Sequence, residues 1–245
     1  MTTYKEINGT NIEAVASDPS NPVEGQVWYN TTSNTVKANY INPGSWATGG
    51  SLNTARSALA GAGTQTAALA FGGSPPVVAI TESYNGTSWT EVNDMNTARY
   101  RLAGVGTQTA ALVFGGFIPP STAATETWNG TNWTAVNSMN TARHFLAGAG
   151  TNTAALAFGG ESPITAITEL WNGTNWAEVN DLNTARFQLA GCGTQTAALG
   201  FGGYSGPITA NTETWNGTNW TEVNNLNTAR QGLAGAGTNT AALAF

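Results

Sequence analysis

The chain has 245 residues, enough for one large repeat domain or two ordinary ones. Charged residues make up only 9% of it, well below the usual ~25%, and its formal net charge is −6. These values exclude the basic surface that nucleic-acid binding requires. The start carries no apolar run and no stretch approaches about 18 apolar residues, so we expect neither a Sec-type signal nor a membrane-spanning segment.

The N-terminal region differs in pattern from the rest of the chain. Residues 1–24 are polar and end in the breaker cluster 18–22, so they are either a flexible terminus or an arm that becomes ordered on a partner. Residues 26–30 suggest a strand around Trp28. Residues 41–46 are a degenerate copy of a hairpin found in every later repeat. We therefore place the domain boundary between residues 24 and 25.

From residue 52 onward the chain repeats every 43 or 44 residues. Each copy opens with Asn-Thr-Ala-Arg and continues with Leu-Ala-Gly-x-Gly-Thr and Thr-Ala-Ala-Leu. The complete copies add Phe-Gly-Gly and an aromatic residue followed by Asn-Gly-Thr-x-Trp. A period of this length indicates an array of identical supersecondary units.

Each unit is predicted to contain four short strands, A to D. In the first copy they span residues 58–62, 67–71, 80–84 and 88–92. Val, Thr, Trp and Tyr favour strands, and no helical period occurs in the repeats. The pair Asn85-Gly86 between strands C and D predicts a type I′ hairpin turn. Four-stranded units of about 43 residues are typical of β-propeller blades.

The order of the conserved-looking features within each copy resembles that of Kelch repeats over residues 46–245. An Arg opens strand A, a Gly-Gly pair follows strand B (72–73, 115–116, 159–160, 202–203), an aromatic residue lies in strand C and a Trp in strand D. The strand C aromatic is mostly Trp here, where Kelch repeats typically have Tyr. WD repeats have a similar length, but this chain lacks their Gly-His and Trp-Asp pairs.

The repeats predict an all-β, five-bladed propeller. Four blades are complete at 52–94, 95–138, 139–181 and 182–225. Residues 226–245 supply only strands A and B of a fifth, so we expect residues 25–51 to supply strands C and D and close the ring. The strand near Trp28 and residues 241–245 are both candidates for strand B of the fifth blade. Either the strand near Trp28 packs outside the blade, or the chain is a piece of a longer array.

Two sets of residues that barely vary between copies are interpreted as scaffold. Each repeat Arg is expected to tie strand A to the neighbouring blade and to pair with a strand C Glu. Each strand D Trp is expected to cover the gap between blades. The predicted structural residues are Arg56, Arg99, Arg143, Arg186, Arg230, Trp46, Trp89, Trp133, Trp176 and Trp220.

Variation between the copies is concentrated at two places, the residue pair after each Arg and the loop after each Gly-Gly. In a propeller with this strand order, both places lie on one face around the axis. The residue types found there suit stacking and hydrogen bonding with a ligand. We call them the variable rim, and predict a binding site at Tyr100, Arg101, Phe117, His144, Phe145, Phe187, Gln188, Tyr204 and Gln231. Drift at tolerant loop positions is the simpler alternative.

The sequence offers no pattern for catalysis or for a metal. One His and one Cys cannot form a metal cluster, and no nucleophile elbow or phosphate-binding loop is present. We therefore expect no catalytic residue, no metal and no cofactor.

Three function classes remain at this stage. Residues 18–32, with their Pro-x-x-Gly-x-x-Trp-Tyr-Asn run, resemble N-terminal stretches of tailed-phage structural and tail-fibre proteins. This resemblance implies a virion protein, made in the host cytoplasm, whose propeller binds a host-surface glycan or protein while its arm contacts other virion proteins. A cellular Kelch adaptor for protein partners is the alternative. A propeller enzyme, such as a lyase or isomerase, is the third reading.

Overall fold

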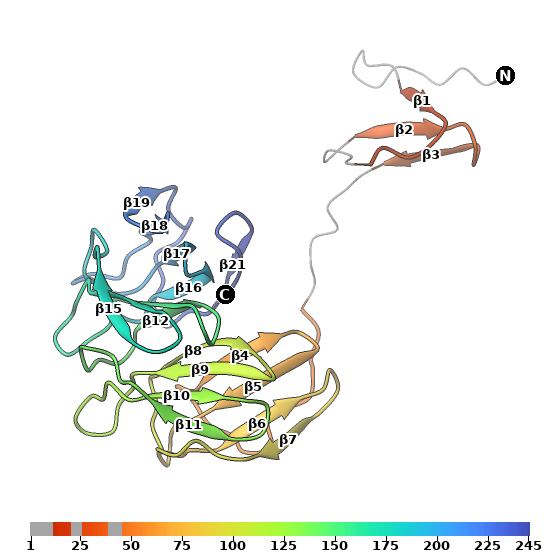
Figure 1. Ribbon diagram of the computed structural model, residues 1–245. Helices are drawn as coiled ribbons and strands as arrows, with labels where there is room; N and C mark the ends of the chain where they lie inside the picture. The colour runs from red at the N-terminus through yellow and green to blue at the C-terminus, as the bar shows by residue number, and fades with distance from the viewer. Residues whose placement is uncertain (1–11, 21–25, 39–45) are drawn as a thin grey trace. The chain divides into compact units, whose positions relative to one another are not determined.

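The computed structural model describes residues 12–20, 26–38 and 46–245, and the chain divides into two compact units, Met1–Thr48 and Gly49–Phe245. All regular secondary structure in the described residues is β-strand (Figure 1). No helix in these ranges is long and apolar enough to cross a membrane. The all-β class predicted from the repeats is confirmed.

The N-terminal unit contains one small mixed sheet. Its strands are β1 (Glu13–Val15), β2 (Val27–Asn30) and β3 (Thr35–Ala38), with β1 and β2 parallel and β2 and β3 antiparallel. Asp18 stabilises this sheet, because its carboxylate accepts hydrogen bonds from Lys37, Trp28 and Asn30 at 2.6–3.0 Å. These bonds, that of Lys37 first, lower the pKa of Asp18 to about 2.

The Gly49–Phe245 unit contains four antiparallel sheets of four strands each, in the order in which the strands occur in the chain. The strands are β4 (Ala60–Thr64), β5 (Ala67–Phe71), β6 (Thr81–Tyr84), β7 (Trp89–Val92), β8 (Ala103–Thr107), β9 (Ala110–Phe114), β10 (Thr125–Trp128), β11 (Trp133–Val136), β12 (Ala147–Gly150), β13 (Ala155–Phe158), β14 (Thr168–Trp171), β15 (Trp176–Val179), β16 (Ala190–Thr194), β17 (Ala197–Phe201), β18 (Thr212–Trp215) and β19 (Trp220–Val223). Strands A to D of each repeat are thus confirmed, with strand A beginning two residues later than expected.

The turn between strands C and D differs from the expected type I′ hairpin. Four residues separate β6 from β7, and of these only Gly86 has a positive φ, at 92°. The side chain of Asn85 folds back instead, and its oxygen accepts hydrogen bonds from the backbone N–H groups of Thr87 and Ser88. Asn is therefore required here for its side-chain carbonyl and not for a left-handed backbone.

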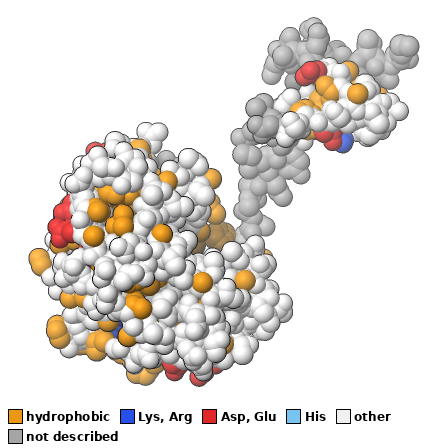
Figure 2. Space-filling model, in the orientation of Figure 1, with side chains coloured by type: hydrophobic (Ala, Val, Ile, Leu, Met, Phe, Trp, Pro, Cys, Tyr) orange, Lys and Arg blue, Asp and Glu red, His pale blue; other side chains and the backbone are white. Residues whose placement is uncertain are grey.

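The inner strands follow one another around a common axis, which gives a propeller-like arrangement. Strand β4 lies against β8, β8 against β12, β12 against β16, and β16 against β20 (Gly235–Gly237). The residues just before all five strands border one cavity of about 180 Å³. Figure 2 shows that the surface is mostly of uncharged polar and backbone atoms, as the low charge content requires.

Neighbouring sheets interlock through a Phe at the end of strand B and a Gly in the next strand A. A Cβ atom at Gly148 would lie only 2.7 Å from the ring of Phe114, and one at Gly191 only 2.5 Å from that of Phe158. Both Phe rings are fully buried. Burying each ring contributes roughly 1.5–3 kcal/mol, so the absent glycine side chain allows a strongly stabilising contact.

The predicted fifth blade is only partly found. Its C-terminal half is the two-stranded sheet of β20 and β21 (Ala242–Ala244). The expected contribution of residues 25–51 needs correction, because Val27–Asn30 pairs with β1 and β3 and so belongs to the N-terminal sheet. The hairpin expected at residues 41–46 lies outside the described residues except for Trp46, which is in no strand and is 78% exposed.

Candidate functional site

The structure brings the two variable places of each repeat together. In each of the four complete repeats, the first residue after the repeat Arg forms an isolated β-bridge with the first residue after Gly-Gly in the same sheet. The bridged pairs are Ser57 with Ser74, Tyr100 with Phe117, His144 with Glu161, and Phe187 with Tyr204. The expectation that both places share one face therefore holds.

Six rings of the variable rim form one continuous row of contacts. Neighbouring ring centroids lie 4.9–5.9 Å apart, in tilted or edge-to-face orientations. Such ring pairs add about 0.5–1.5 kcal/mol each beyond the area that they bury. The order of the row is Tyr100, Phe117, His144, Phe145, Phe187 and Tyr204.

The second residue after each repeat Arg has a left-handed backbone conformation. The φ angles are 53° at Ala58, 57° at Arg101, 54° at Phe145, 53° at Gln188 and 66° at Gly232. Each N–H donates to the carbonyl of the equivalent residue in the preceding unit, from Arg101 to Ala58 at 2.8 Å and then around the axis to Gly232. This backbone chain holds the five units together at the axis.

Glycine would adopt that conformation without steric cost, yet only the fifth unit uses it. A left-handed residue with a side chain costs about 1–3 kcal/mol, and such strain is concentrated at functional sites. Arg101, Phe145 and Gln188 adopt this conformation with long side chains, whereas Ala58 adopts it with a methyl group. All three line the axial cavity, which is floored by leucines of the five units, Leu102 and Leu146 among them.

Arg101 lies at the centre of the row of rings. Its guanidinium carbon is 4.4 Å from the ring centroid of Phe145, 5.0 Å from that of Tyr100 and 5.8 Å from that of Phe117. Aromatic faces attract a cation at these distances and leave the edge of the guanidinium open for hydrogen bonds. The arrangement therefore presents a positive charge at the mouth of the cavity.

His144 joins the row to two polar residues that the sequence did not single out. Its Nδ1 is 2.9 Å from the hydroxyl of Ser121, and its Nε2 is 3.5 Å from the carboxylate of Glu161. Burial lowers the pKa of His144 below its usual value; Glu161 opposes this shift and the charge of Arg101 adds to it. Only the bridge between strand A and the B–C loop reveals these partners, since they lie 17 and 23 residues from His144 in the chain.

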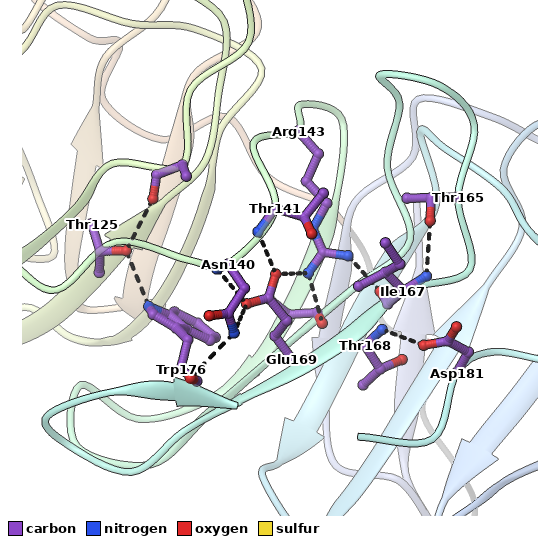
Figure 3. Close-up of polar contacts among 12 residues, drawn as sticks. Thr125, Asn140, Thr141, Arg143, Thr165, Ile167, Thr168, Glu169, Trp176 and Asp181 are labelled. Atoms are coloured by element: carbon purple, nitrogen blue, oxygen red, sulfur yellow. Dashed lines mark hydrogen bonds and ion pairs between the residues drawn. The ribbon is translucent and has the colours of Figure 1, made fainter. Parts of the chain in front are cut away.

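The repeat arginines form buried ion pairs with the predicted strand C glutamates, which are Glu82, Glu126, Glu169 and Glu213. In Figure 3 the guanidinium of Arg143 faces Glu169, whose carboxylate also accepts from the backbone N–H groups of Asn140 and Thr141. The expectation that the side chain reaches the neighbouring blade is wrong, because Arg and Glu belong to the same sheet. The Arg backbone makes that link: the carbonyl of Arg143 accepts from Gly116.

The carboxylate of Glu82 is held in its charged form despite its burial. Burial disfavours ionisation of Glu82, but hydrogen bonds from Arg56, Asn53 and Thr54 outweigh it and hold the pKa of this carboxyl below its usual value. Equivalent Asn and Arg donors bind the strand C glutamate in each of the next three units, and Thr141 donates as well in the third. The motif Asn-Thr-Ala-Arg therefore binds a strand C glutamate.

The strand D tryptophans behave as predicted in three of the five places. The indole N–H of Trp133, Trp176 and Trp220 donates to a Thr at the start of strand C in the preceding sheet, at 3.0–3.1 Å. Trp89 is only half-buried and donates to the carbonyl of Gly50 instead. Trp46 is mostly exposed.

The fifth unit departs from the pattern at every predicted position. Arg230 is exposed and donates to the carbonyl of Ala244, with no ion pair to a described carboxylate. Gln231 is exposed and lies outside the row of rings. Of the nine predicted binding residues, eight lie in the row of rings or at the axial cavity, and Gln231 is the exception.

No protein-family model matches the chain, and a search of curated proteins finds no match. The resemblances to Kelch repeats and to phage structural proteins therefore rest on the sequence motifs alone.

Proposed function

We propose that this protein is a non-enzymatic binding module of a phage particle and that its variable rim binds a glycan on the host surface. The observation that carries the proposal is the use of strained, left-handed Arg101, Phe145 and Gln188 where glycine would suffice. In a scaffold of near-identical units, such residues are retained for what they contact. The Kelch-like repeats and the phage-like segment 18–32 support the assignment to a virion.

The geometry of the rim favours a sugar. Sites for small molecules combine aromatic walls with a few placed polar groups. Here six rings are joined by the amide of Gln188 and the guanidinium of Arg101. The cavity, at about 180 Å³, is smaller than the roughly 300–1,000 Å³ of drug-sized pockets, so it admits one end of a ligand that rests on the rings.

Binding to a glycan array tests this proposal. We expect the wild-type protein to bind a defined subset of host-surface glycans and the Tyr100→Ala, Phe145→Ala, Phe187→Ala triple variant to lose at least about tenfold in affinity, since it removes three of the six rings. A matched triple variant, Gln65→Ala, Thr109→Ala and Thr153→Ala, changes exposed residues in the A–B turns on the opposite face. It should bind as the wild type does.

Other results would redirect the assignment. Specific capture of a host protein without any glycan binding favours a protein ligand or the Kelch adaptor reading. Chemical conversion of a bound sugar supports the enzyme reading, for which Ser121 and His144 would be the first residues to change.

We further infer that the fifth unit is completed by a strand pair and that the ring closes onto the first sheet. Phe245 is 51% exposed, whereas its equivalents Phe114 and Phe158 are fully buried against a glycine of the next unit. A Cβ at Gly61, the equivalent glycine of the first sheet, would meet only the carbonyl of Leu69. Phe245 and Gly61 would then form one more junction, and the degenerate hairpin at residues 41–46 is the part of the predicted segment 25–51 that would supply the missing strands.

Hydrogen exchange in the full chain and in a chain that starts at Gly49 tests this closure. We expect the amides of β21 to be protected in the full chain and to exchange much faster without the N-terminal residues, because the strand then lacks its neighbour. Equal protection in both proteins, with an unchanged melting temperature, would show that residues 1–48 do not complete the fifth unit.

A further inference from the structure

The charge of Arg101 is not used within the protein. The Gly49–Phe245 unit contains six arginines, and four of them form buried ion pairs with strand C glutamates. Arg230 donates to a backbone carbonyl. In the described residues the guanidinium of Arg101 has neither a hydrogen bond nor a carboxylate within ion-pair distance. Its contacts are three aromatic rings.

The rings fix this cation in place without neutralising it. Phe145 and Tyr100 lie beside it, with ring centroids 4.4 and 5.0 Å from the guanidinium carbon. The nearest acidic residue of the rim, Glu161, lies against His144. Five N–H donors are therefore presented at the axial cavity in the forked geometry that matches a carboxylate.

We propose that the ligand of the variable rim is an acidic glycan and that Arg101 binds the carboxylate of its terminal sugar, with the amide of Gln188 beside it. The proposal rests on the proposed glycan function and specifies it. A sialic or uronic acid combines the two required features, a planar carboxylate for the guanidinium and an apolar ring face for Phe145 and Phe187. A charge-assisted, bidentate pair of this kind is both strong and selective.

Paired acidic and neutral glycans test the proposal on the full chain. The probes are sialyllactose against lactose, and oligogalacturonate against its methyl ester. We expect the wild-type protein to bind one acidic member at least about tenfold more tightly than its neutral partner, as loss of a hydrogen-bonded charge predicts. The Arg101→Gln variant should lose this preference; glutamine already occupies the equivalent left-handed position as Gln188.

Two further variants separate charge from geometry. Arg101→Lys keeps the charge but not the planar fork, so its affinity should lie between those of wild type and Arg101→Gln. Arg230→Gln removes an equal charge from an exposed position outside the rim and should bind as the wild type does. Thermal unfolding of each variant shows that it is folded.

The outcomes distinguish this inference from the proposed function. Equal binding of acidic and neutral members, unaffected by Arg101→Gln, overturns the inference and leaves glycan binding intact. Sulfated lactose bound as tightly as sialyllactose overturns the assignment of a carboxylate. A wild-type protein that binds no sugar but captures polyglutamate overturns both.

Discussion

Replacing Glu169 by alanine is expected to lower the free energy of unfolding by about 3–5 kcal/mol, because it leaves the guanidinium of Arg143 buried without its counter-ion. The side chains of Arg143 and Glu169 are no more than 1% exposed. The substitution also removes the acceptor of the backbone N–H groups of Asn140 and Thr141 and of the side-chain amide of Asn140, so four donors lose this acceptor at once. Denaturant unfolding at equilibrium measures the loss.

A matched control separates this effect from the removal of a negative charge. Glu178 lies opposite Glu169 in the same sheet but is exposed, so Glu178→Ala should change stability by no more than about 0.5 kcal/mol. Arg143→Ala should likewise lower the melting temperature while the folded protein retains its ligand binding. A variant of Arg143 that keeps full stability but loses binding would contradict the scaffold role.

The repeat made most of the fold predictable from the sequence. Its period gave the number of sheets, and small residues followed by Gly-Gly gave the positions of strands A and B. The match arises because local and tertiary requirements coincide in a repeat: every unit must fit an identical neighbour. The partner of each repeat Arg was predicted for the same reason, since Glu recurs at a fixed distance from it.

The errors occur where the repeat ends. Nothing in residues 26–30 indicates that they pair in parallel with Glu13–Val15, because register between separate segments is not encoded by spacing alone. The same is true of the direction of each Arg side chain, which turns into its own sheet. The type I′ turn predicted from Asn85-Gly86 was wrong for a local reason. The pair suits several turn types, and the length of the loop decides among them.

The site was predictable as a set of positions and not as a geometry. Differences between copies identified Tyr100, Phe145 and Phe187 without any structure. The left-handed backbone, the row of ring contacts and the isolation of Arg101 from acidic residues depend on how five units meet at the axis. Ser121 and Glu161 were missed because their link to His144 passes through a bridge between two loops.

Replacing Phe158 by alanine should cost about 3–5 kcal/mol, the largest effect that we expect for a single core residue. Its ring is fully buried, lies 4.8 Å from that of Trp220 between centroids, and fills the space left open by Gly191. Residues of two sheets enclose the ring, so we expect the cavity to collapse only in part. Denaturant unfolding with an unchanged m-value would assign the loss to the folded state.

The same substitution at Phe245 reports on the fifth unit, because the two residues occupy equivalent positions in the repeat. Phe245 is half-exposed in this structure, and at that exposure its ring would contribute less than about 1 kcal/mol to the free energy of unfolding. If the ring closes as we propose, Phe245 becomes buried against Gly61, and Phe245→Ala in the full chain should approach the cost of Phe158→Ala. We also expect Gly61→Val to be as destabilising as Gly148→Val, by about 1–3 kcal/mol or more. If Gly61→Val is neutral while Gly148→Val is not, the first and fifth units do not meet, because a ring packed at that junction would clash with the added side chain.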